Sequence, residues 1–149
     1  MTPTQMSLDP QAAFEAFLDA LMSCDASKVA ALLAPDAVLE FPFAPEGAPE
    51  RVVGRAEIEH YFVKAFEAKT PIAFTDLSFR PLADAHEVFA EFKSEMQANA
   101  DQRRYRNRYC AILRVGPSGV ELFREWYDPA VDADLRKTAH ADMTRTAVT

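Results

Sequence analysis

The chain has 149 residues, and its 16 lysines and arginines stand against 23 aspartates and glutamates, so the formal net charge is -7. This acidic balance argues against a nucleic-acid groove, and the two cysteines and three scattered histidines predict neither a disulfide framework nor a metal site. No apolar run approaches the roughly 20 residues that cross a bilayer, and residues 1–10 lack the basic and apolar stretches of a signal peptide. These properties predict a reduced cytoplasmic protein with no nucleic-acid or membrane partner, whose partner is a small molecule or a second copy of the chain.

Three helices are predicted in the first half of the chain. Asp9 suits the N-cap of the first helix and Pro10 its first turn, and an apolar stripe at helical spacing follows with Phe14, Phe17, Leu18, Leu21 and Met22. A shorter helix begins after Asp25 and stops at Pro35, because the proline ring cannot continue a helix. Gly54 opens the third helix, whose apolar stripe contains Ile58, Tyr61, Phe62, Ala65 and Phe66.

The other elements are predicted to be strands. Residues 37–43 look extended, with one face formed by Leu39, Phe41 and Phe43. Residues 44–51 contain two prolines and a glycine, which is typical of a loop. After residue 71 the hydrophobic period changes to two, which is typical of strands, over Ile72–Leu82, Glu87–Ala98, Arg103–Val115 and Val120–Asp128.

The order of these elements predicts an α+β fold in which the helices cover one face of a curved antiparallel sheet. Residues 9–129 form a single domain in this interpretation, residues 1–8 a disordered N-terminus, and residues 130–149 a tail that is partly helical or disordered. Within residues 103–115, alternation assigns the tyrosines and Asn107 to the buried face and the arginines to the other face. We interpret that basic stripe as a solvated or dimer-facing surface in preference to a nucleic-acid site.

Several short sequence words carry a family resemblance over roughly residues 9 to 130. They are Leu32-Leu33-Ala34-Pro35-Asp36-Ala37-Val38-Leu39-Glu40-Phe41-Pro42, Val53-Gly54-Arg55-Ala56-Glu57-Ile58, Tyr105-Arg106-Asn107-Arg108-Tyr109, Gly119-Val120 and Arg124-Glu125-Trp126-Tyr127-Asp128. With this element order, the chain resembles the SnoaL-like proteins of the ketosteroid isomerase-like, nuclear transport factor two-like superfamily. The resemblance implies a cone-shaped fold that encloses a pocket, and a homodimer formed through the outer face of the sheet. Members include isomerases, hydrolases, dehydratases, polyketide cyclases and non-catalytic binding modules, so the fold does not settle the function.

The resemblance implies the catalytic residues of the ketosteroid isomerase, but this sequence lacks them. Its base, a carboxylate before a proline at the end of the first strand, corresponds to Phe41, and its tyrosine donor corresponds to Phe17. Its protonated aspartate, which is the worked example of a carboxylic acid kept neutral by an apolar site, corresponds to Ala111, or to Cys110 if the turn is shifted. Steroid isomerisation by that mechanism is therefore not expected, and Phe17 and Phe41 make the pocket more apolar.

Glu125 is the candidate catalytic residue. It lies in an Arg-Glu-aromatic motif that resembles the one in the phenazine-biosynthesis A/B branch of the family. The resemblance implies that a glutamate at this position acts as an acid/base group in the pocket. By alternation Phe123, Glu125 and Tyr127 share a face, and aromatic neighbours would raise the pKa of the carboxyl by desolvation. The alternative is a register slip that leaves Glu125 in solvent, paired with a strand arginine. The branch also uses a histidine from the third helix, but His60 falls about one residue out of register.

Two further positions have open interpretations. Glu91 is either a second pocket carboxylate or a solvated cross-strand partner of Arg104 or Arg106, and the second interpretation is favoured. Asn107 and Tyr109 either orient a ligand carbonyl in the pocket or hydrogen-bond to each other.

The leading hypothesis is a cofactor-independent pocket protein, without a metal, for a small, largely apolar, carbonyl-bearing molecule. Glu125 would move a proton during isomerisation, dehydration or condensation, and Tyr109, Asn107 and Tyr127 would hold the oxygen that gains charge. The apolar wall of the pocket would be formed by Phe17, Phe41, Phe62 and Phe123. The competing hypothesis is a non-catalytic ligand-binding or dimerising module whose cavity phenylalanines fill. A cavity of about 300 Å³ or more with Glu125 at its wall would favour the first hypothesis.

Overall fold

The computed structural model describes residues 9–133, so the expectations for residues 1–8 and 134–149 lie outside the described residues. Its helices are α1 (Pro10–Met22), α2 (Ala26–Ala30) and α3 (Arg55–Ala68). The side chain of Asp9 accepts a hydrogen bond from the backbone N–H of Ala12 at 3.1 Å and so caps α1. Asp25 caps α2 in the same way through the N–H of Ser27, at 2.9 Å. None of the helices in this part of the chain is long and apolar enough to cross a membrane.

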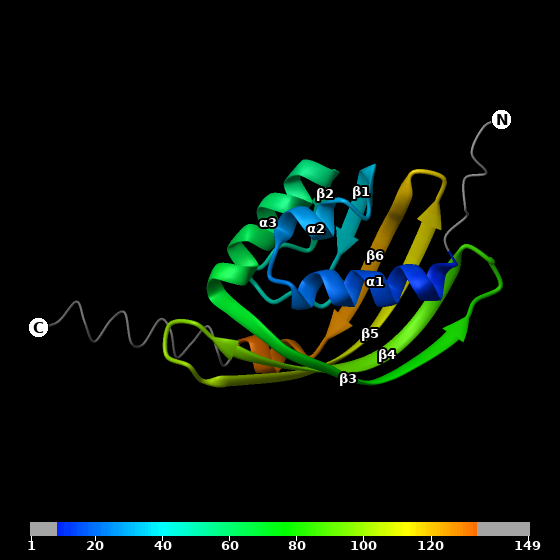
Figure 1. The fold of residues 1–149 in the computed structure, drawn as a ribbon. Helices are drawn as coiled ribbons and strands as arrows, with labels where there is room; N and C mark the ends of the chain where they lie inside the picture. Colours follow the sequence, from blue (N-terminus) through cyan, green and yellow to red (C-terminus); the bar gives the residue numbers. More distant parts are fainter. Residues whose placement is uncertain (1–8, 134–149) are drawn as a thin grey trace, which may run out of the picture.

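Within residues 9–133 the strands form one six-stranded sheet. The strands are β1 (Leu33–Glu40), β2 (Arg51–Val53), β3 (Lys69–Pro81), β4 (Glu87–Ala98), β5 (Arg104–Gly116) and β6 (Gly119–Tyr127), in the spatial order β2-β1-β6-β5-β4-β3. Neighbouring strands are antiparallel except β1 and β6, which run parallel. The long strands curve beneath α1, and α2 and α3 lie beside β1 (Figure 1). The predicted α+β class, with helices over one face of a curved sheet, is confirmed.

The first strand differs from its predicted extent. It begins at Leu33 and includes Pro35, which lies where the pairing of β1 with β6 shifts register between Leu33 and Val38. A bulge tolerates proline, because the ladder hydrogen bond that proline cannot donate is already missing there. The strand ends at Glu40, so Phe41 stays buried while Phe43 is 57% exposed. The prediction that Phe43 shares the buried face with Leu39 and Phe41 is therefore wrong.

β2 was not predicted. It has only three residues, Arg51–Val53, directly after a loop rich in proline and glycine, and its pairing with β1 joins Val38 to Val53. Three residues are too few to reveal an alternation. Tertiary pairing with a long neighbour therefore makes this segment a strand.

The core lies between the helices and the sheet face that they cover, which we call the inner face. Phe14 and Phe17 on α1 are fully buried. The ring of Phe14 meets Phe79 and Phe92 edge-on at 5.5 and 5.6 Å, and the ring of Phe17 stacks on Phe123 at 4.5 Å. These contacts attach α1 to β3, β4 and β6, and they fix the helix above the sheet.

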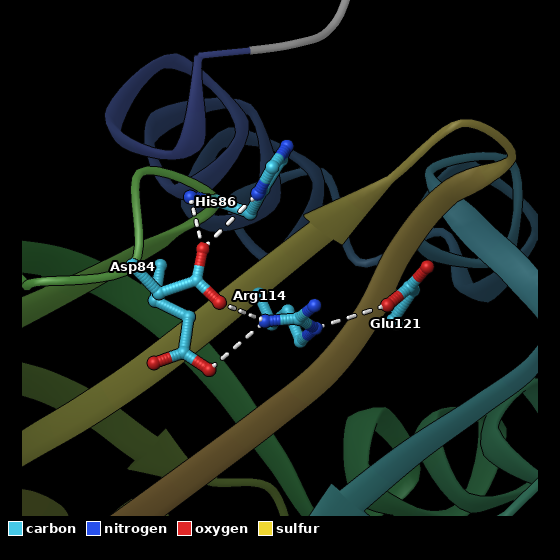
Figure 2. A network of polar contacts seen from close by, with 5 residues as sticks. Asp84, His86, Arg114 and Glu121 are labelled. Atoms are coloured by element: carbon cyan, nitrogen blue, oxygen red, sulfur yellow. Dashed lines mark hydrogen bonds and ion pairs between the residues drawn. The ribbon is translucent and has the colours of Figure 1, made fainter.

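The opposite face of the sheet, the outer face, carries the arginines of β5. At one end of that face, Arg114 donates to Asp84 at 2.6 Å, to Glu87 at 3.2 Å and to Glu121 at 3.2 Å (Figure 2). Asp84 also accepts a hydrogen bond from the backbone N–H of His86, and this bond, together with Arg114, holds the pKa of Asp84 well below its usual range. The network ties the β3–β4 turn to β5 and β6.

Candidate active site

A cavity of about 580 Å³ lies between the helices and the inner face of the sheet. This volume is within the range of ordinary small-molecule sites. It exceeds the roughly 300 Å³ that would favour a ligand pocket over a cavity filled by phenylalanines. Aromatic side chains from α1, α3, β3 and β6, and from the residue that follows β1, form much of the wall, among them Phe17, Phe41, Tyr61, Phe62, Phe66, Phe74 and Phe123. Residues 47–49 of the proline-rich loop line it as well.

The four phenylalanines expected in the pocket wall all line the cavity. Phe17 lies between Phe123, at 4.5 Å, and Phe62, whose ring centroid is 6.1 Å away. Phe41 packs against Tyr127 at 6.1 Å and against Tyr61 at 5.7 Å. Phe17 and Phe41, which the sequence resemblance matched to the donor and the base of the steroid isomerase, present only hydrocarbon to the cavity.

Glu125 is on β6 between Phe123 and Tyr127, and its side chain lines the cavity. Opposite it on β5 is Ala111, which is fully buried. Burial disfavours the charged carboxylate and raises the pKa of Glu125 from 4.5 to about 8, although Lys69 works against this shift. Glu125 is therefore a protonated acid at neutral pH, with a pKa close to the value that suits proton transfer there.

Tyr109 also lines the cavity, from β5. Its hydroxyl is 2.7 Å from the hydroxyl of the buried Ser94 on β4, and its ring stacks on Phe92 at 4.8 Å. Burial, followed by the nearby Glu125 carboxyl, raises the pKa of Tyr109 well above its ordinary value. The phenol therefore stays neutral and keeps an O–H at the wall.

Asn107 is buried, but within residues 9–133 the cavity lining does not include it. Its amide nitrogen donates to the hydroxyl of Tyr105 at 2.7 Å and to the carbonyl of Asp128 at 3.1 Å, and its amide oxygen accepts from the N–H of Asp128 at 3.0 Å. Tyr109, the partner of Asn107 in one of the two open interpretations, instead meets Ser94. Asn107 thus holds the end of β6 and orients Tyr105, which is itself on the cavity wall.

Sequence reasoning did not name several polar lining residues as site residues, among them Lys69, Tyr105 and Asp132. The ammonium of Lys69 is 3.7 Å from a carboxylate oxygen of Asp132 and 4.0 Å from the centre of the Tyr105 ring. Alternation had already assigned Tyr105 to the inner face. No local sequence pattern identifies Lys69 or Asp132 as a site residue, because Lys69 lies at the predicted end of the third helix and Asp132 in the predicted C-terminal tail.

Glu91 and His60 lie away from this cavity in the described part of the chain. Glu91 is exposed and pairs in register with Cys110 across β4 and β5. The arginines expected to pair with it, Arg104 and Arg106, instead meet Glu95 at 3.7 and 3.2 Å. His60 is exposed on α3. Among the described residues, no group of three or more histidine, cysteine or acidic side chains could hold a metal ion.

The fold is the ketosteroid isomerase-like α+β fold, which the chain shares with solved proteins below 25% identity that are described as ketosteroid isomerase-like. The family model described as "SnoaL-like domain" matches residues 14–120. The chain therefore belongs to the SnoaL-like family.

Two sequence relatives and one solved structure illustrate this membership. The chain is 31% identical over 97 residues to the protein YesE of Bacillus subtilis (strain 168), which is 64% of this chain and 65% of YesE. It is also 31% identical over 98 residues to the PhzA/B-like protein PA3332 of Pseudomonas aeruginosa, which is 66% of this chain and 69% of that protein. A crystal structure of a Bacillus subtilis protein, a proposed isomerase, has a TM-score of 0.78 and 26% identity, and the match covers 83% of this chain and 88% of the other. The sequence match to YesE spans slightly less than two thirds of the length of that protein.

Proposed function

We propose that this protein is a cofactor-independent acid–base enzyme that acts on a small, largely apolar, carbonyl-bearing molecule. The observation that carries the proposal is Glu125, a carboxyl with a pKa of about 8 on the wall of an aromatic cavity of about 580 Å³. The reaction class is isomerisation, dehydration or condensation, because each needs a proton moved at or beside a carbonyl and none needs a redox group. Isomerase and polyketide cyclase are also the activities proposed for solved proteins of this fold.

Glu125 works in either direction because its pKa is near neutral pH. In its protonated form it gives a proton to a carbonyl or leaving hydroxyl oxygen, and in its ionised form it takes one from the carbon beside a carbonyl. The hydroxyl of Tyr109, held by Ser94, supplies a hydrogen bond to the oxygen that gains charge, and Tyr127 flanks the same carboxyl. Asn107 contributes indirectly, since it fixes Tyr105 and the end of β6.

The cavity walls support a preference for a flat, apolar ligand. The rings of Phe17, Phe62 and Phe123 offer faces and edges to the cavity and few polar partners. A ligand ring that replaces water against such a surface gains roughly 25 cal/mol for each Å² of apolar area buried. A non-catalytic ligand-binding module of the same fold is the competing function, and it would not need a carboxyl held in its acid form.

We infer further that the protein forms a homodimer through the outer face of its sheet. The half-buried Phe89, Ile112 and Trp126 lie on that face between the exposed Arg108 and the half-buried Arg114, and in the described part of the chain the helices cover the other face. Apolar side chains rimmed by charge are typical of an interface between protein chains.

The test of the catalytic proposal is the pKa of Glu125, measured by carboxyl-carbon NMR and assigned with Glu125→Gln. We expect a titration near 8, well above the unperturbed value of about 4.3. The NMR spectra of Glu125→Gln should otherwise match those of the wild type, and its turnover of any carbonyl substrate found by screening should be lost. A pKa at or below the ordinary value would contradict the proposal and favour the binding module.

A further inference from the structure

Charged side chains form an unexpected part of the cavity wall. The lining contains two lysines and two carboxylic acids, namely Lys64, Lys69, Glu125 and Asp132. Lys69 is the first residue of β3, directly after α3, and Asp132 lies in the helical turn at 129–133 that follows β6. The two residues are far apart in sequence and meet only because the turn after β6 reaches the start of β3.

Two contacts hold the ammonium of Lys69 at the wall. It lies 3.7 Å from the carboxylate of Asp132 and 4.0 Å from the centre of the Tyr105 ring. The Lys69 side chain is only 23% exposed and that of Asp132 11%. The carboxylate and the aromatic face hold the cation in place, because both contacts offset part of the cost of removing its charge from water. The cation is also close enough to Glu125 to lower the pKa of that carboxyl against the effect of burial.

We propose that Lys69 is a second functional group of this site: its ammonium binds the ligand oxygen on which negative charge rests or develops, and Asp132 is the positioning residue that holds it there. This inference rests on the proposed function and adds the cation to it. When ionised Glu125 takes a proton from the carbon beside a carbonyl, the C–H electron pair forms the enolate double bond and the carbonyl oxygen becomes negative. Lys69 stabilises that oxygen until Glu125 returns the proton to a carbon conjugated with the enolate, where the delocalised electron pair forms the new C–H bond and the carbonyl is restored.

The charge balance of the cavity supports this role. With Glu125 protonated, the lining within residues 9–133 holds the cations of the half-buried Lys69 and the exposed Lys64 and one aspartate anion, an excess of one positive charge in a chain whose net charge is -7. Among the described residues, the other titratable groups on the wall are tyrosines from α3, β5 and β6, namely Tyr61, Tyr105, Tyr109 and Tyr127. Burial raises the pKa values of Tyr105 and Tyr109, so they remain neutral. One negative oxygen therefore complements the cavity below about pH 8, and this complementarity weakens as Glu125 ionises.

The first test needs no ligand. The pKa of Glu125 is measured by carboxyl-carbon NMR in the wild type, in Lys69→Met and in Asp132→Asn. Lys69→Met should raise the pKa because it removes the cation, and Asp132→Asn should lower it because it leaves the cation without its neutralising anion. The exposed ion pair of Lys93 with Asp76, at 3.1 Å, supplies the matched controls Lys93→Met and Asp76→Asn, which should leave the Glu125 pKa unchanged. An unchanged pKa in Lys69→Met would overturn the proposal.

The second test separates a binding role from a purely structural ion pair. Naphthoate and naphthamide have the same shape, and only the first carries a negative oxygen. The wild type and Glu125→Gln should both prefer naphthoate in calorimetric titrations at neutral pH. Lys69→Met should lose affinity for naphthoate on the order of tenfold and keep its affinity for naphthamide. Equal losses for both probes, or no preference in the wild type, would overturn the role of Lys69.

Failure of this inference is distinguishable from failure of the proposed function. If Glu125 titrates near 8 but Lys69→Met changes neither its pKa nor the probe preference, the acid–base proposal stands and Lys69 is structural. If Glu125 titrates at an ordinary carboxyl value, the acid–base proposal itself fails. If neither probe binds, an unchanged Glu125 pKa in Lys69→Met still overturns the Lys69 proposal.

Discussion

The side-chain amide of Asn107 forms two hydrogen bonds with the backbone of Asp128, accepting from its N–H at 3.0 Å and donating to its carbonyl at 3.1 Å. The amide thereby pairs β5 with the chain just beyond the end of β6, where no strand partner continues the ladder in the described residues. The helical turn that carries Asp132 starts at the next residue. Asn107 therefore couples the sheet to the segment that completes the cavity.

Replacement of Asn107 by alanine should destabilise the protein by roughly 2–3 kcal/mol, because it leaves Tyr105 and the Asp128 backbone without their buried partner. Urea unfolding measures the change. Arg108→Ala, the exposed neighbour on the same strand, should shift the free energy of unfolding by less than about 0.5 kcal/mol. Similar small effects of both variants would contradict the anchoring role.

The stability of the protein should fall as pH rises between about 4.5 and about 8 through Glu125. Below this interval the carboxyl is protonated in both folded and unfolded chains. Within it the folded chain keeps a proton that the unfolded chain releases, so deprotonation favours unfolding, and the full effect on the order of a few kcal/mol is reached above about pH 8. Glu125→Gln cannot titrate, so its stability minus that of the wild type should increase with pH when both are unfolded in urea. A constant difference would show that the carboxyl is solvated.

Phe17→Ala should cost about 3–5 kcal/mol of folding free energy, because its ring is fully buried and stacks on Phe123 at 4.5 Å. Phe43→Ala is the matched control, since Phe43 is 57% exposed and its removal leaves no cavity. Thermal or urea unfolding compares the two variants. The same loss in both would mean that α1 is not held by this stack.

Reversal of charge at Arg106 and Arg108 should shift the protein toward the monomer if the outer face forms the dimer. Both arginines are exposed on β5, and glutamates there would repel one another across a symmetric contact. Sedimentation velocity measures the shift, and Lys28→Glu on α2 should leave the sedimentation coefficient unchanged. An unchanged coefficient in Arg106→Glu/Arg108→Glu would assign the interface to another surface.

Much of the fold was predictable because it depends on local periodicity. The helical stripe around Phe14 and Phe17 and the alternation along β5 and β6 mark which side chains face inward. The same alternation assigned Glu125 to the face of Phe123, and in the structure both side chains line the cavity. The short strand β2 and the exposure of Phe43 were not predictable, because both depend on where a loop folds back on β1.

The sequence by itself determined the family, the α+β class and which side chains of β5 and β6 share a face, since spacing along the chain sets the alternation. Only the tertiary structure decided which polar groups meet. Asn107 bonds to Asp128 and not to Tyr109, Arg106 meets Glu95 and not Glu91, and Lys69 reaches Asp132. Each of these pairs depends on strand register or on the path of the chain after β6, and no local pattern encodes a contact between segments so far apart.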